Sequence, residues 1–117
     1  MARVVIVDSN RDGLEMYVTA LALEGIEAAA ATSAGEALDV IAKTQPRAVV
    51  TELRLPGTRT TDLIERVRRA VPHGLIVGLS ASGSREAKEA RDAGCDIVLN
   101  VPCLPDTLVR ELQHALN

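Results

Sequence analysis

Aromatic side chains are nearly missing from this sequence of 117 residues: Tyr17 is the only one, and neither Phe nor Trp occurs. Recognition by base stacking or by an aromatic cage needs exposed rings, so the sequence excludes both. Positive charge is also scarce, because 13 basic residues stand against 16 acidic ones and the formal net charge is −3. A chain with this balance has no basic field to attract phosphate backbones. We therefore expect no direct binding to nucleic acid.

Cysteines and long apolar runs are limited too. Cys95 and Cys103 are the only cysteines, and no Cys-x-x-Cys motif is present. No apolar run approaches the roughly 18 residues of a membrane-spanning helix, and no charged-then-apolar leader opens the sequence. These absences predict a cytoplasmic protein with reduced thiols and no membrane association. His73 and His114 are too far apart in sequence to indicate a metal site.

Aliphatic residues in short runs are what the sequence has in quantity. The hydrophobic fraction of 47% suffices for one core in a chain of this length, so we expect a single domain over residues 1–117. Five short apolar runs predict buried strands at residues 3–8, 26–32, 47–52, 75–80 and 96–100. The alanine-rich run at 26–32 favours a strand only through its position between Gly25 and a helix cap at Ser33.

Amphipathic segments with helical spacing follow each predicted strand. Ser9 before Asp12, and Ser33 before Glu36, have the spacing of capping boxes that begin the first two helices. Strand and helix therefore alternate five times. This alternation predicts a doubly wound α/β domain, with a parallel sheet of order 2-1-3-4-5 and helices on both faces.

The carboxyl ends of the predicted strands carry polar side chains. Asp8 ends the first strand, Glu52 the third and Ser80 the fourth. In a sheet of this order the ligand crevice lies at the carboxyl edge, where the first and third strands diverge. Asp8 and Glu52 are therefore expected side by side at this edge, with Ser80 next to them.

Four motifs, in this order and spacing, resemble the receiver domains of two-component response regulators: VVIVD at 4–8, TELRLPG at 51–57, LSA at 79–81 and AGCDIVLNVP at 93–102. The resemblance extends over essentially the whole chain. It implies a CheY-like, (βα)5 flavodoxin-like fold and a role in phosphorelay signalling. In that family an Asp on the third strand accepts a phosphoryl group and two acids on the first strand hold Mg²⁺. A Ser or Thr ends the fourth strand, a Lys before Pro ends the fifth, and an aromatic switch residue lies in the fifth.

Carried over by position, the family's site falls on residues that depart from its pattern. The acceptor is Glu52, the acid pair is Asp8 and Ser9, the hydroxyl is Ser80, the lysine is Val101, and the aromatic switch is Ile97. Ser9 provides no charge for Mg²⁺, and Val101 cannot neutralise the oxygens of a phosphoryl group in transfer. Glu52 also extends about 1.5 Å further than Asp would, by ordinary bond lengths.

These departures predict a degenerate receiver, or pseudo-receiver, that is not phosphorylated in the usual way. We expect no cofactor, a weak Mg²⁺ site at best, no enzymatic activity, and signalling through protein–protein contacts in one fixed conformation. Glu52 could hold that conformation by accepting a hydrogen bond from Ser80. Arg54 could place its guanidinium group between Asp8 and Glu52 as a substitute cation.

Two other functions remain open at this point. One is a conventional phosphorelay receiver that accepts phosphoryl groups at low efficiency, on Ser9 or Ser80. The other is a flavodoxin-like domain that binds a nucleotide or flavin, although no glycine-rich phosphate loop follows the first strand. For the pseudo-receiver, the candidate partners are a histidine kinase, an output protein and a second copy of the chain.

Overall fold

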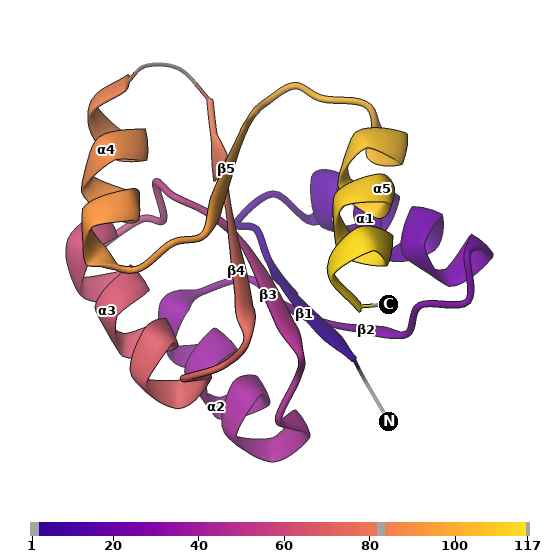
Figure 1. Cartoon of the computed structure of the whole chain (residues 1–117), viewed down its shortest axis with the longest axis horizontal. Helices are drawn as coiled ribbons and strands as arrows, with labels where there is room; N and C mark the ends of the chain where they lie inside the picture. Colours follow the sequence, from indigo (N-terminus) through magenta and orange to yellow (C-terminus); the bar gives the residue numbers. More distant parts are fainter. Residues whose placement is uncertain (1–2, 82–83, 117) are drawn as a thin grey trace.

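Five parallel strands form one sheet in a computed structural model that describes residues 3–81 and 84–116 (Figure 1). The strands are β1 (Val4–Val7), β2 (Ala28–Ala31), β3 (Ala48–Glu52), β4 (Leu75–Ser80) and β5 (Ile97–Asn100). The helices are α1 (Arg11–Leu23), α2 (Ala34–Thr44), α3 (Thr60–Ala70), α4 (Ser84–Ala93) and α5 (Pro105–Leu116). The strand order is β2-β1-β3-β4-β5, which confirms the predicted fold class and topology.

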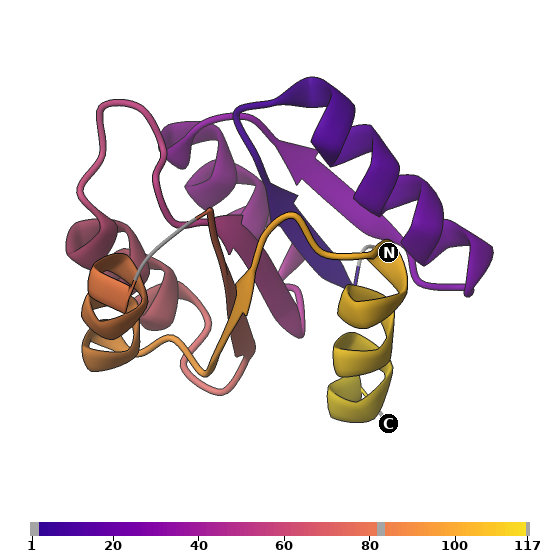
Figure 2. The same ribbon diagram turned by 90° about the horizontal axis from the view of Figure 1, so that it is seen from above.

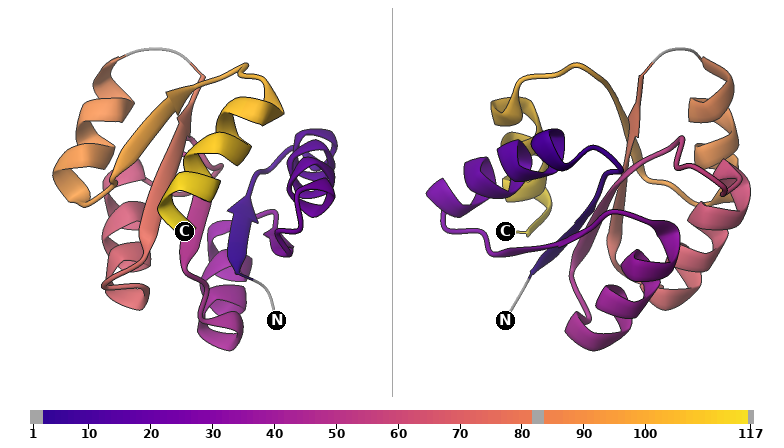
Figure 3. Two further views of the ribbon diagram at one scale, coloured as in Figure 1. Left: turned by 45° about the vertical axis from the view of Figure 1, so that its right-hand side comes forward. Right: turned by 180° about the vertical axis from the view of Figure 1, so that it is seen from behind.

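The helices cover both faces of the sheet. α1 and α5 lie together on one face, and α2, α3 and α4 follow one another across the other (Figure 2, Figure 3). Alternate side chains of each strand therefore enter two separate cores. Val5 and Val7 pack on the side of α2 and α3, whereas Val4 and Ile6 pack on the side of α1 and α5. Burial on both faces explains why β1 is an uninterrupted apolar run.

Helix α1 begins at a different cap from the predicted one. Its N-cap is Asn10, whose side-chain oxygen accepts hydrogen bonds from the backbone N–H groups of Asp12 (2.9 Å) and Gly13 (3.2 Å). The prediction that Ser9 caps this helix is wrong, because the Ser9 hydroxyl group donates to Glu52 on β3. The cap at Ser33 is confirmed in α2, where its hydroxyl oxygen accepts from the N–H of residue 36 at 3.2 Å.

Arg68 fastens the C-terminal end of α3 to the amino ends of β4 and β5. Its guanidinium group donates to the carbonyl oxygens of Gly94 (2.7 Å) and Gly74 (2.8 Å) and to the carboxylate of Asp96 (2.7 Å). A cation at this end of a helix also complements the helix dipole. The contacts lie at the edge of the sheet opposite to Asp8, so they stabilise the fold without entering the predicted site.

A glycine in β4 sets the path of the chain after β3. A Cβ atom at Gly78 would lie 2.7 Å from Cδ2 of Leu53 and 3.2 Å from Sγ of Cys95. Leu53 is fully buried and follows Glu52 directly. The missing side chain at position 78 therefore lets Leu53 pack against the sheet, which fixes where the chain leaves it. Cys95 and Cys103 are both free thiols, as predicted.

Candidate functional site

A hollow of about 580 Å³ lies at the carboxyl edge of the sheet, where β1 and β3 diverge. We call it the acidic pocket. Its lining residues come from the ends of four strands, the first turns of α1 and the loops that follow the strands: Asp8, Asn10, Gly13, Met16, Tyr17, Glu52, Arg54, Leu79, Ala81, Val101 and Pro102. This is the position at which doubly wound sheets bind ligands.

The two acids lie side by side because β1 and β3 are paired in parallel. Val7 is in register with Thr51, so the next residues along the two strands, Asp8 and Glu52, reach the pocket together. Asp8 is only 8% exposed, and its Oδ1 accepts the backbone N–H of Asn10 at 2.8 Å. The sequence-based placement of this acid pair is therefore the one that the structure has.

Glu52 is held by a residue from the neighbouring strand end. Ser9 Oγ donates a hydrogen bond to Glu52 Oε1 at 2.7 Å. Burial raises the pKa of the Glu52 carboxyl group, and the adjacent Asp8 raises it further, while the hydrogen bonds from Ser9 act in the opposite direction. The expected donor to Glu52 was Ser80, and the structure gives this role to Ser9.

The other positions carried over from the resemblance lie at the far side of the pocket or outside it. Ser80 ends β4 and is 1% exposed, and its carbonyl oxygen accepts the N–H of Val101 at 2.9 Å. Val101 lines the pocket with an apolar side chain. Ile97 is half-buried on β5 and packs against the core on the side of α1 and α5, so it does not line the pocket.

Arg54 does not occupy the position proposed for it between the two acids. Its guanidinium group forms an ion pair with Glu86 of α4. Glu86 lies in the first turn of α4, and its side chain is only 16% exposed. The ion pair therefore links the loop after β3 to α4, and the side chain of Arg54 itself stays 77% exposed.

The sequence analysis missed the contribution of α1 to the pocket. Gly13, Met16 and Tyr17 all line it. The hydroxyl group of Tyr17 lies 3.8 Å from Sγ of Cys103, and burial, with smaller contributions from Cys103 and Asp8, raises the pKa of Tyr17 to about 12. A glycine inside a helical pattern was the available signal, because it is unfavourable there unless a close approach requires it.

Magnesium is the metal that the resemblance implies, and the two carboxylates of the pocket are its candidate ligands. Mg²⁺ takes a near-octahedral shell of oxygens, usually from one or two carboxylates together with waters and phosphate oxygens. Two carboxylates line the pocket, and one oxygen of each already accepts a hydrogen bond, from Asn10 and Ser9. Over the described part of the chain, no group of three or more His, Cys, Asp or Glu side chains could hold a metal ion. The pocket thus supplies two carboxylates toward such a shell, and the expectation of a weak Mg²⁺ site at best stays a prediction.

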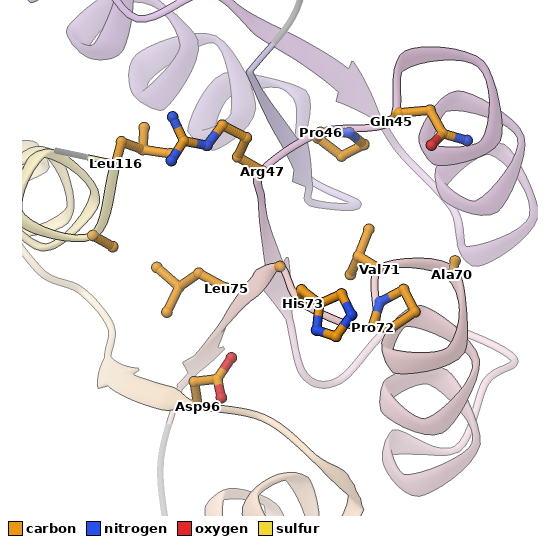
Figure 4. Close-up of a pocket in the computed structure, with 12 residues that line it drawn as sticks. Gln45, Pro46, Arg47, Ala70, Val71, Pro72, His73, Leu75, Asp96 and Leu116 are labelled. Atoms are coloured by element: carbon orange, nitrogen blue, oxygen red, sulfur yellow. The ribbon is translucent and has the colours of Figure 1, made fainter.

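A second hollow, of about 630 Å³, lies at the opposite edge of the sheet (Figure 4). Arg47, His73, Leu75 and Asp96 are among the residues around it. The carboxylate of Asp96 is already engaged by Arg68 and by the backbone N–H of residue 76. Among the described residues, the hollow and the acidic pocket have no lining residue in common, so the acid pair does not line this hollow. Within residues 3–81 and 84–116, no helix is long and apolar enough to cross a membrane.

Relatives of known description match nearly the whole chain. A response regulator receiver protein of Anaeromyxobacter sp. (strain Fw109-5) is 35% identical over 103 residues, which are 87% of this chain and 43% of that protein. The phosphate regulon transcriptional regulatory protein PhoB of Pseudomonas aeruginosa is 29% identical over 119 residues, covering 97% of this chain and 51% of PhoB. The chain thus spans about half or less of the length of the curated relatives it matches.

Solved structures and the family pattern agree with these relatives. The CheY-like receiver domain protein of Methanospirillum hungatei JF-1 has a TM-score of 0.92 at 25% identity, over 99% of this chain and 94% of that one. Chemotaxis response regulator CheY4 of Vibrio cholerae has a TM-score of 0.88 at 25% identity, over 98% of both chains. The family pattern of the response regulator receiver domain matches residues 4–113. The chain therefore belongs to the receiver domain family of two-component response regulators.

Proposed function

We propose that this receiver domain signals through protein–protein contacts that do not depend on phosphorylation, and that it has no catalytic activity of its own. The observation that carries the proposal is the arrangement at the acceptor position. There, the longer side chain of Glu52 accepts a hydrogen bond from Ser9, and Val101 lies across the pocket in place of a cation.

Glu52 is a poor acceptor in this setting. Its carboxylate reaches about 1.5 Å beyond that of an aspartate at the same position, into the space that an acyl phosphate would fill. One of its oxygens already accepts the Ser9 hydroxyl group. Burial and the adjacent Asp8 also raise the pKa of this carboxyl group. Its position and its hydrogen bond both act against attack on a phosphoryl donor.

The pocket also lacks the charge that phosphoryl transfer needs. Three equatorial oxygens of the transferred group must be neutralised by cations. Among the lining residues that the structure describes, Arg54 is the one cation, and its guanidinium group is bound to Glu86. The incoming anion would instead meet Asp8 and Glu52, whose negative charges repel it. This electrostatic balance disfavours both approach and transfer.

Receiver domains interact with kinases and output domains in two-component systems. In our proposal this domain makes contacts of that kind from one permanent conformation. The Arg54–Glu86 ion pair supports a fixed arrangement, because it joins the loop after β3 to α4. The partner is a signalling protein or an output domain; its identity does not follow from the pocket.

Incubation with acetyl phosphate and Mg²⁺, followed by intact mass spectrometry, tests the proposal. We expect no stoichiometric phosphoryl adduct on the natural chain. The triple variant Ser9→Asp, Glu52→Asp, Val101→Lys is the positive control, because it restores the acid pair, the shorter acceptor and the cation. Glu52→Gln serves to locate any adduct. A stoichiometric adduct on Glu52, Ser9 or Ser80 of the natural chain would contradict the proposal and favour a conventional receiver.

A further inference from the structure

We propose that the acidic pocket binds an alkylammonium group on an apolar stem, the group that a lysine side chain of a partner protein presents. The inference rests on the proposed function, because a phosphorylated pocket would select a different set of charges. It names the chemistry of the contact that a phosphorylation-independent receiver makes at this edge of the sheet.

The first argument is the acid pair at the floor of the pocket. Asp8 is more than nine-tenths buried, yet it lines the pocket. Its Oδ1 accepts one hydrogen bond from Asn10, and Glu52 accepts one from Ser9 through Oε1. The backbone N–H of Ser9 and the carboxyl group of Asp8 also hydrogen-bond with Glu52, and Asp8 Oδ2 faces the space beside Gly13. A compact ammonium group carries three donors and a full charge, which suits two carboxylate oxygens on one side of a hollow.

The second argument is a space kept open beside Asp8. Gly13 lies in the first turn of α1 and lines the pocket. A Cβ atom at this position would lie 3.0 Å from Asp8 Oδ2, the oxygen that the N–H of Asn10 does not engage. Any larger residue would therefore crowd the carboxylate on the pocket side. Glycine in this helix keeps the buried oxygen open to a guest.

The third argument is the apolar wall above the acids. It is formed by aliphatic, aromatic and thioether side chains from α1 and from the ends of β4 and β5: Met16, Tyr17, Leu79, Val101 and Pro102. A strongly hydrated divalent ion gains nothing from such a wall. The methylene stem of a lysine can pack against it while the charged end reaches the acids. A hollow of about 580 Å³ accommodates a side chain of this size.

Binding is measured by NMR titration of the ¹⁵N-labelled full chain with Nα-acetyl-lysine N-methylamide. We expect saturable shifts at the amides of Ser9, Gly13 and Val101. The uncharged analogue Nα-acetyl-norleucine N-methylamide should bind at least tenfold more weakly. Butylammonium tests the source of the group. Weaker binding than the blocked lysine supports a partner's side chain, and equal binding supports the same chemistry supplied by a free amine. Absence of saturable shifts with both amines overturns the proposal.

Matched variants locate the site. Asp8→Asn should weaken lysine-analogue binding at least tenfold, while Asp39→Asn, which removes the same charge from an exposed position on α2, should not change it. Val101→Lys supplies an internal ammonium group and should also abolish binding, whereas the uncharged Val101→Met should retain it. Equal losses in Asp8→Asn and Asp39→Asn would contradict a specific site. The dispersion of the same spectra shows whether each variant is folded.

The two proposals fail separately. If neither amine binds while the natural chain stays unphosphorylated, only the ammonium site is refuted. If a phosphoryl adduct forms, the proposed function is refuted, and the amine titration still reports on the site by itself.

Discussion

Substitution of Gly78 by alanine should destabilise the domain through a contact next to the acidic pocket. The new Cβ would lie 2.7 Å from Cδ2 of Leu53, 3.1 Å from its Cγ and 3.2 Å from Sγ of Cys95. Overpacking of a buried site costs about 1–3 kcal/mol, whereas replacing glycine with alanine returns about 0.4–1 kcal/mol through the unfolded chain. The steric cost is larger, so we expect a net loss of about 1–2 kcal/mol in the free energy of unfolding.

Urea denaturation followed by far-UV circular dichroism measures this loss, with an unchanged dependence on denaturant. Gly35→Ala on α2 is the matched control, because nothing lies within 4 Å of its added Cβ, and it should be neutral or slightly stabilising. Leu53→Ala alone should cost about 2–5 kcal/mol. The double variant Gly78→Ala, Leu53→Ala should lose less stability than the sum of the losses in the two single variants, by about 1 kcal/mol or more. Strict additivity would refute the claim that the clash is with Leu53.

Three further predictions concern charge and burial. The carboxyl pKa of Glu52, followed by NMR, should lie above its usual value and should fall in Asp8→Asn. A carboxyl group whose pKa is raised in the folded state destabilises that state as the pH rises through its pKa. Glu52→Gln should therefore stabilise the domain by up to about 1 kcal/mol at pH 7 but not below pH 4. A gain independent of pH would contradict this. Arg68→Ala should lower the free energy of unfolding, measured by urea denaturation, by about 2–3 kcal/mol, whereas the control Arg69→Ala, at an exposed position, should lower it by less than about 0.5 kcal/mol. Similar losses in the two variants would disprove the role given to the contacts of Arg68 with backbone carbonyl groups. Burial raises the pKa of the Cys95 thiol, so iodoacetamide should alkylate this thiol only at the rate at which the domain unfolds. Peptide mass mapping measures the alkylation. Rapid alkylation of the folded chain would show that the thiol is accessible.

The fold could be predicted because its signals are local or periodic. Each buried strand is a short apolar run, and the alternation with helices permits few topologies. The same reasoning placed Asp8 beside Glu52, since the residue at the end of a parallel strand must reach the carboxyl edge. Even the alanine run of β2, which favours a helix by propensity, was predicted correctly from the turn and cap around it.

The contacts within the site depended on partners distant in the sequence. Ser9 and Asn10 are both good N-cap residues, and what separates them is Glu52, 43 residues from Ser9. The sequence suggested that Arg54 could bind the acid pair of Asp8 and Glu52, yet its guanidinium group pairs with Glu86 of α4. Such choices depend on the final positions of loops and helices, which hydrophobic periodicity does not encode.

Tyr17 gives this domain a built-in optical reporter. It is the only residue of the chain that absorbs strongly near 280 nm or emits in the ultraviolet, and it is 5% exposed at the wall of the acidic pocket. Near-ultraviolet dichroism and fluorescence therefore carry a signal from one place alone, with no background from other rings. Occupancy of that corner of the molecule can be followed in solution without attaching a dye.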